Sequence, residues 1–348
     1  MADVRGPEQP PRAASSESTD RPRRDRAQLF LVGAIVLAVL LVALAVLLNA
    51  VIYTGNLATR DTGADVAATI EYDDAAHDAA LEVFTATNDY ADENEANHTQ
   101  LEANLTGGIG AWETASAEHA AIRGTMSSIE NVETTDGYRL QQATNDSFHP
   151  NSDDNTTEWD LADSTRVRNY TINATPENQV NADTLNDTDP GNVTDTFFVE
   201  FEGDETYYLY LYESDSGDGC TLVHDGTDGI DRACVDGPTF VVNLTADPTN
   251  STATISNSST GDSSEFNTTF FQDLDPNHSI TYHNPGNISG EYDLVVESDD
   301  GSVVYDDEPP NSTEVIYDLE YDVVRRSDSL HYRNGTRIAP KEAPYDAS

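Results

Sequence analysis

The segment TFFVEFEGDETYYLYLYES (residues 196–214) decides the fold class of the C-terminal part of the chain. It holds two runs of aromatic and β-branched residues, TFFVEFE and TYYLYLYES, separated by Gly and Asp. TFVVNLT (239–245) and EYDLVVES (291–298) repeat this composition. Short runs of this kind, bounded by turn residues, are typical of β-strands. We therefore predict an antiparallel, sandwich-like β domain over residues 196–340.

Two features near the C-terminus support the same prediction. Asp300-Gly301 stands between two apolar runs, which is a strong signal for a β-hairpin. From residue 317 to residue 323, Tyr, Leu, Tyr and Val alternate with acidic residues. This alternation indicates a strand with one buried face and one face in water.

Two series of mainly apolar residues upstream follow a helical spacing instead. The first consists of Val66, Ile70, His77, Leu81 and Phe84, and the second of Leu101, Leu105, Ile109, Trp112, His119, Ile122, Met126 and Ile129. We predict two amphipathic helices that form a stem over residues 60–130, with a break near 93–97. Residues 131–195 are dominated by Asn, Asp, Thr and Ser, so we predict a loop-rich polar region with weak strands there.

Leu29 to Leu48 is an unbroken run of apolar residues and glycine, long enough as a helix to cross a bilayer. Four arginines stand before it, at positions 21, 23, 24 and 26. The positive-inside rule then predicts a cytoplasmic, disordered tail over residues 1–26, a transmembrane helix over 27–52 and a C-terminal domain outside the cell. The expected localisation is a single-pass protein of the cell membrane.

The sequence Arg26-Ala27-Gln28-Leu29, followed by the apolar run, resembles the amino-terminal signal of archaeal type IV pilin-like proteins. The resemblance covers about residues 21–50 and is nearest to a haloarchaeal pilin-like, anchored group. It implies that a membrane peptidase cuts between Ala27 and Gln28 and that sister subunits are partners. Many pilins carry Glu at the fifth mature position, where this chain has Val32, so a plain uncleaved anchor is the preferred interpretation and a cleaved, pilin-like subunit is the alternative.

The net charge of −47 comes from 64 acidic and 17 basic residues. Such a field repels nucleic acid and anionic headgroups, so we expect no nucleic-acid partner. An acidic, lysine-poor surface stays soluble in molar salt, which screens its self-repulsion, and this indicates a halophilic source. The expected partners are the lipid bilayer and components of the cell surface.

Sixteen Asn-x-Ser/Thr sequons follow the apolar run, and we predict that they are glycan acceptors on an exported surface. A composition rich in Ser, Thr and Asn is the alternative reason for their number. They begin at Asn97, Asn104, Asn145, Asn155, Asn169, Asn173, Asn186, Asn192, Asn243, Asn250, Asn257, Asn267, Asn277, Asn287, Asn311 and Asn334.

The two cysteines, Cys220 and Cys234, lie in the predicted external part, and we predict a disulfide between them. The acidic loop SDSGDGC suggests a calcium site, but only Asp218 supplies a carboxylate where the calcium-loop template needs three. Solvated acidic loops are therefore the preferred interpretation. Motifs for zinc proteases, serine hydrolases and nucleotide binding do not occur, so we predict no catalytic residue, metal or cofactor.

These features together predict an α+β chain: a transmembrane helix, a helical stem and a β-rich extracellular head. The expected function is that of a glycosylated, membrane-anchored surface protein with a structural or adhesive role, in pilin-like form as one possibility, and not that of an enzyme. One alternative is an anchored module that binds a solute or polysaccharide on the tyrosines of residues 207–212. Another is an extracellular hydrolase without a recognisable motif.

Overall fold

The computed structural model describes residues 41, 65–122, 124–153, 155–187, 190–274, 277–298, 305, 309–328 and 330–345. The chain divides into two compact units, residues 1–66 and 67–348. The second unit has an α+β fold in which every strand-to-strand ladder is antiparallel. The α+β class predicted from the sequence is therefore confirmed for this unit.

The described part opens with a helix over residues 65–94. The other helices are α2 (His98–Ile122), α3 (Ala182–Asp187) and α4 (Phe270–Asp273). The strands are β1 (Met126–Ser147), β2 (Glu158–Thr165), β3 (Val167–Pro176), β4 (Phe197–Glu202), β5 (Thr206–Glu213), β6 (Gly219–His224), β7 (Gly229–Val235), β8 (Phe240–Asp247), β9 (Thr252–Asn257), β10 (Asp262–Asn267), β11 (His278–His283), β12 (Ile288–Glu297), β13 (Asn311–Arg326) and β14 (His331–Ile338).

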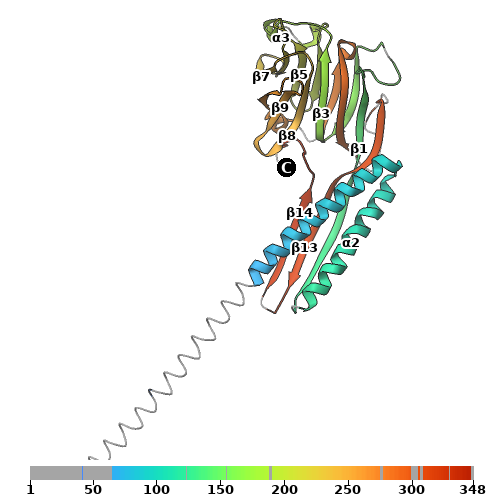
Figure 1. The fold of residues 1–348 in the computed structure, drawn as a ribbon, viewed down its shortest axis with the longest axis vertical. Coiled ribbons are helices and arrows are strands. Elements are labelled where there is room, and N and C mark those ends of the chain that lie inside the picture. The colour runs from blue at the N-terminus through green and yellow to red at the C-terminus, as the bar shows by residue number, and fades with distance from the viewer. Residues whose placement is uncertain are drawn as a thin grey trace, which may run out of the picture. The chain divides into compact units, whose positions relative to one another are not determined.

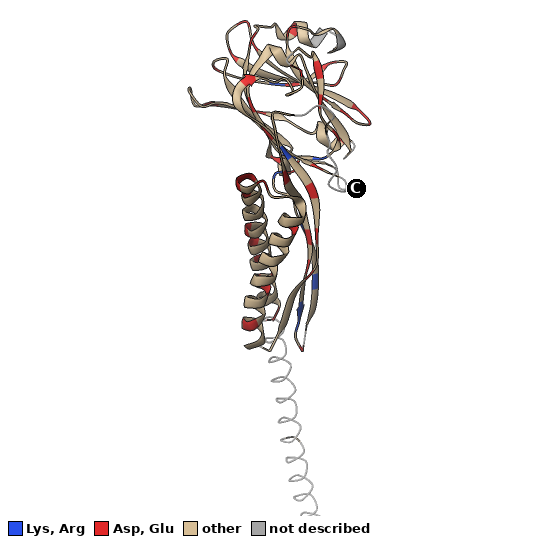
Figure 2. Ribbon diagram, turned by 90° about the vertical axis from the view of Figure 1, so that its right-hand side faces the viewer, with Lys and Arg blue, Asp and Glu red and all other residues tan. Residues whose placement is uncertain are grey.

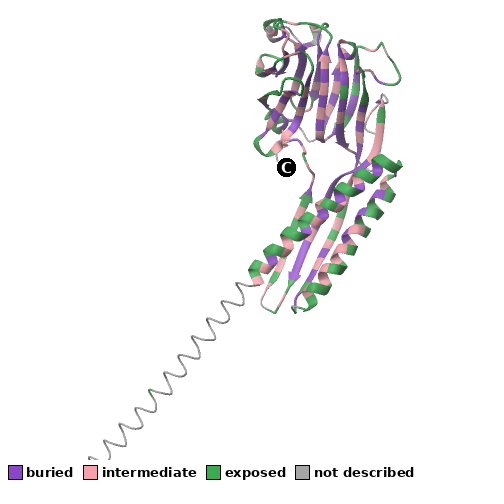
Figure 3. Ribbon diagram, in the orientation of Figure 1, coloured by how far each residue is buried: buried purple, intermediate pink, exposed green. Residues whose placement is uncertain are grey.

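Two sheets contain these strands. The larger has the order β10-β9-β8-β3-β12-β1-β13-β14, and the smaller has the order β2-β11-β4-β5-β6-β7. Aromatic and aliphatic side chains of both sheets share one apolar core. Figure 3 shows buried residues along the strands of both sheets. Tyr170 of the larger sheet and Tyr282 of the smaller meet in it, with their hydroxyl oxygens 2.9 Å apart. We call this two-sheet part the head.

β1 and β13 are longer than the other strands, and each extends from the head into a second part of the unit (Figure 1). The C-terminal half of β1 pairs with β12 in the head, whereas its N-terminal half pairs only with β13, from Met126 opposite Arg326 onward. β14 pairs with the C-terminal half of β13, which is the half that pairs with the N-terminal half of β1. The three strands form a narrow extension of the larger sheet, which the two long helices cover.

The helices bury one face each on this extension, and we call the assembly the helix–sheet layer. Its core contains Phe84 of the first helix, Leu105 of α2 and Leu319 of β13, all at most 2% exposed. The helices approach closely at Gly108, where an added Cβ would lie 2.7 Å from a methyl carbon of Val83. α2 begins with a capping box, because the side chain of Asn97 accepts from the N–H of Gln100 and that of Gln100 accepts from the N–H of Asn97.

The predicted stem differs from the structure at its end. Met126 and Ile129, which continue the helical spacing of the sequence, lie in β1. The helix ends at Ile122, and Gly124 has a φ of 72°, a left-handed conformation that favours glycine and ends helices. Beyond it Ile129 packs into the same core as the helices. Ile129 is therefore apolar because it is buried, but it is buried in a strand and not in the predicted helix.

The region predicted as loops, residues 131–195, contains most of β1 together with β2, β3 and α3. Its polar residues occupy the outward positions of strands whose inward positions are apolar, as in β3, where Tyr170, Ile172 and Ala174 are fully buried. The loop prediction was wrong because composition outweighed the alternation of period two in that region. The β fold therefore starts at Met126 and not at residue 196.

The predictions for the N-terminal segment lie outside the described residues, apart from Leu41. They are the disordered tail, the transmembrane helix and the cleavage site between Ala27 and Gln28. The hairpin signal at Asp300-Gly301 lies outside them as well. Among the residues that are described, no helix has the length and apolar character needed to span a bilayer.

Candidate functional site

Basic residues gather where the helix–sheet layer meets the head. Nine Lys and Arg residues are described, and five of them lie here, among many acidic residues (Figure 2). These five are Arg139, Arg166, Arg168, Arg337 and Lys341. In a chain with so few cations, their shared position marks this junction as the most distinctive charged site of the described part.

Arg139 of β1 joins three elements at the junction. Its guanidinium donates to both carboxylate oxygens of Asp293 on β12, at 2.7 Å (Nε) and 2.5 Å (Nη2), and it also pairs with Asp92 of the first helix. The hydrogen bond with Asp293 raises the pKa of Arg139 above its usual value. A bidentate pair of this kind fixes both distance and orientation.

Arg168 of β3 is only 7% exposed and has no carboxylate within ion-pair distance among the described residues. Its Nη2 donates to the carbonyl oxygen of Ile316, at 3.0 Å. The rings of Phe84 and Tyr317 lie 5.3 and 5.7 Å from the guanidinium carbon, within the range of cation–π attraction. Burial lowers the pKa of Arg168 to about 10, so the group keeps its charge at neutral pH.

A third arginine ties the C-terminal segment to the layer. Arg337 of β14 donates to Asp318, at 2.5 Å, and to both carboxylate oxygens of Glu342, at 2.6 and 2.8 Å. Asp318 is 4% exposed, although the alternation in its strand predicts a face in water. Arg166 lies 3.5 Å from the same Glu342. Asp318 is therefore buried because the guanidinium of Arg337 pairs with its carboxylate.

Arg139, Arg168 and Lys341 border a cleft of about 270 Å³ between the first helix and the sheet. Asn88 closes one side of it, since its amide nitrogen donates to the carbonyl of Ile316 (3.0 Å) and its oxygen accepts from the N–H of Ile316 (2.8 Å). The bordering arginines already bind protein carboxylates, carbonyls or rings. The junction is thus built as a joint that holds the helix–sheet layer against the head. Sequence reasoning missed it, and the scarcity of cations was the available signal.

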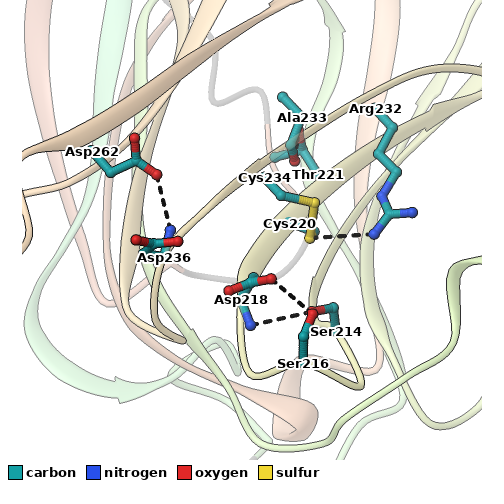
Figure 4. Close-up of a disulfide and its surroundings, with 10 residues drawn as sticks. All are labelled: Ser214, Ser216, Asp218, Cys220, Thr221, Arg232, Ala233, Cys234, Asp236 and Asp262. Carbon is teal, nitrogen blue, oxygen red and sulfur yellow. Dashed lines mark hydrogen bonds between the residues drawn. A yellow bond between two sulfur atoms is a disulfide. The ribbon is translucent and has the colours of Figure 1, made fainter.

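The predicted disulfide is present. Cys220 of β6 and Cys234 of β7 are bonded and lie opposite each other in the ladder (Figure 4). The neighbouring turn, which raised the calcium hypothesis, satisfies its own polar groups: Ser216 bonds to Ser214 (2.9 Å) and to Asp218 (2.8 Å). Within the described residues, no group of three or more His, Cys, Asp and Glu side chains is placed to hold a metal ion.

Most of the predicted glycan acceptors lie at the surface. Of the fifteen sequon asparagines whose burial is described, nine are exposed, five are half-buried and one, Asn257, is buried. Its amide nitrogen donates to the carbonyl oxygen of Asp236, at 2.6 Å, and its side-chain oxygen accepts from Ser259 and Thr260. Asn257 therefore has a structural role that a glycan would abolish.

The tyrosine run of β5 does not form an open stacking surface. Tyr210 and Tyr212 are fully buried in a second apolar cluster on the outer face of the smaller sheet, under the segment that contains α3. Leu209 and Leu211 face the common core on the other side. β5 is thus covered on both faces, and only Tyr207 and Tyr208 keep partial exposure.

Residues 23–157 match a family described as a family of unknown function (DUF7261). The match includes the apolar run, both long helices and all of β1, and it leaves strands β2 to β14 outside it. No curated protein matches the chain.

Proposed function

We propose that this chain is a membrane-anchored, glycosylated protein of the outer cell surface with a structural or adhesive role. In this proposal the apolar run from Leu29 to Leu48 anchors the chain, and the α+β unit faces outward. The observation that carries the proposal is the placement of the sequons. All follow the apolar run, and fourteen of the fifteen with described burial reach the surface.

The disulfide and the charge support the same environment. Disulfides persist in oxidising compartments outside the cytosol, and this chain has no other cysteine. The chain carries 64 acidic and only 17 basic residues. Salt screens the repulsion among so many carboxylates, so an acidic exterior suits a protein exposed to concentrated brine. Neither observation names a partner.

Exposed apolar side chains favour a contact at the end of the helix–sheet layer that lies away from the head. Ile70, Ile122 and Met126 are 58, 84 and 74% exposed. They share this end because Met126 pairs with Arg326 and because Arg325 donates to the carbonyl of Ala68. Apolar groups gathered at one surface are typical of contact with a membrane or with another subunit.

Two measurements on the native protein test this proposal. Protease treatment of intact cells should remove the head, and mass spectrometry of glycopeptides should find sugar on exposed sequons. A head that is protected in intact cells, or sequons that are all unmodified, would refute the surface assignment.

The N-terminal peptide of the membrane-extracted chain separates the two forms of the proposal. A chain that begins at Gln28 has been cut by a prepilin-type peptidase and supports a pilin-like subunit. A chain with an intact arginine-rich tail supports a simple anchor and argues against filament assembly.

A further inference from the structure

A small cleft of about 200 Å³ lies in the head where the edge strands of the two sheets come together. Its walls come from β5, β6, β7, β10 and α4. A hydrogen bond links the two edge strands beside the cleft: the N–H of Asn267 on β10 donates to the carboxylate of Asp231 on β7, at 2.7 Å. The cleft is distinct from the charged joint between the head and the helix–sheet layer.

The floor of the cleft is apolar. The rings of Tyr207 and Phe270 lie 5.5 Å apart between centroids. Ile230 beside them is 53% exposed, and beyond the start of β1 no other large apolar side chain in the described residues is classed as exposed. An exposed apolar side chain next to two aromatic rings is a surface that gains free energy when it is covered.

The rim of the cleft is polar and rich in acceptors. The hydroxyl of Tyr207 donates to Asp273, at 3.3 Å, and the carboxylate of Asp231 faces the same space. Carboxylates have several lone pairs each, so these two retain capacity to accept hydrogen bonds from hydroxyl groups. The ring of Tyr207 and the exposed side chain of Ile230, with carboxylates beside them, match the chemistry of a sugar, whose C–H face is apolar and whose hydroxyls donate.

A sequon asparagine borders this cleft. Asn267, followed by Thr268 and Thr269, is exposed and lines the cleft with Tyr207 and Ile230. Its side-chain oxygen accepts from the N–H of Thr269, at 2.7 Å, which fixes the orientation of the amide. In the described structure the amide nitrogen takes part in no hydrogen bond, in contrast to that of Asn257.

We propose that the cleft is the seat of the glycan carried by Asn267, whose first sugars pack on the half-buried ring of Tyr207 and cover Ile230, while the buried ring of Phe270 supports Tyr207. This inference rests on the proposed function, because it requires export and glycosylation. A cellular glycosyltransferase would join the amide nitrogen to the first sugar of a lipid-phosphate-linked oligosaccharide; the nitrogen loses a proton, and the lipid phosphate leaves. The chain's own contribution is to bind the attached sugar.

The test compares the glycosylated full chain from its native host with two variants. Asn267→Gln removes the sugar at the cleft, and Asn145→Gln removes one from an exposed sequon on β1 that does not line it. Hydroxyl-radical footprinting then reports the solvent access of Ile230 and Tyr207. We expect Asn267→Gln to increase labelling of both residues several-fold and Asn145→Gln to leave it unchanged.

A reciprocal variant keeps the sugar and removes its seat. Ile230→Ser changes an exposed side chain, so the fold should persist, and we expect an endoglycosidase to release the Asn267 glycan several-fold faster than from the parent. Equal footprints with an occupied Asn267, or an unoccupied Asn267 while other sequons carry sugar, would overturn the inference alone. Absence of sugar from every sequon would overturn the proposed function with it.

Discussion

Tyr292 gives the sharpest test of how the core of the head is built. Its side chain is 2% exposed and packs against Phe148 and Tyr282, with ring centroids 5.3 and 5.4 Å away. Its hydroxyl is buried and has no hydrogen-bond partner in the described structure. Burial raises the pKa of this hydroxyl well above its usual value. We expect Tyr292→Phe to stabilise the protein.

The magnitude follows from the state of the hydroxyl. A buried polar group without a partner costs about 1–3 kcal/mol, and its removal recovers this cost less the dispersion contacts of one oxygen atom. The expected gain in the free energy of unfolding is therefore about 1 kcal/mol. Tyr170→Phe is the matched control, because Tyr170 is equally buried but its hydroxyl bonds to that of Tyr282. This control should lose about 1–3 kcal/mol, since it leaves the hydroxyl of Tyr282 unpaired.

Denaturant unfolding of the full chain in detergent and molar salt measures both changes. Fluorescence of Trp159 reports on the same core, because this residue is 2% exposed and its ring lies 5.6 Å from that of Tyr282. The transition midpoint should rise for Tyr292→Phe and fall for Tyr170→Phe at an unchanged slope. If both variants lose similar stability, the Tyr292 hydroxyl has a partner and the reasoning is wrong.

Three further changes test other parts of the structure. Replacing Cys220 and Cys234 by Ser should lower the free energy of unfolding by about 3 kcal/mol, as expected for a closed loop of this size, and the same assay under reducing conditions should abolish the difference. Asn257→Ala should cost about 1–3 kcal/mol because it leaves the carbonyl of Asp236 and two N–H groups unpaired, and glycopeptide analysis of the parent should find Asn257 without sugar. Raising the pH above 10 should destabilise the head, because unfolded tyrosines then lose protons that buried ones keep. The free energy of unfolding should fall by at most about 1.4 kcal/mol per pH unit for each buried tyrosine, and a stability that does not change with pH would contradict this. Burial raises the pKa of Tyr170, Tyr282, Tyr292 and Tyr317.

The local sequence pattern was sufficient to predict structure where it indicated only one type of element or one pairing. The alternation around residues 196–214 predicted β4 and β5, and the apolar spacing after Val66 predicted the helix over residues 65–94. The two cysteines had only each other as partners, so their disulfide followed from the compartment that the sequence indicates. In each case, the residues that decide the structure are neighbours along the chain or are the only ones of their kind.

Tertiary structure decided what depends on contacts between distant segments. The polar residues 131–147 form most of a 22-residue strand because β12 and β13 flank them and supply backbone partners, which no local composition encodes. The same holds for Tyr210 and Tyr212 of β5, which are buried because α3 and its neighbouring segment cover the outer face of the smaller sheet. The sequence by itself determined the element types at the strongest periodic segments, the single disulfide and the acidic, sequon-rich surface. Which sequon is buried and which arginines form the joint were set only by folding, because burial and pairing are properties of the assembled strands.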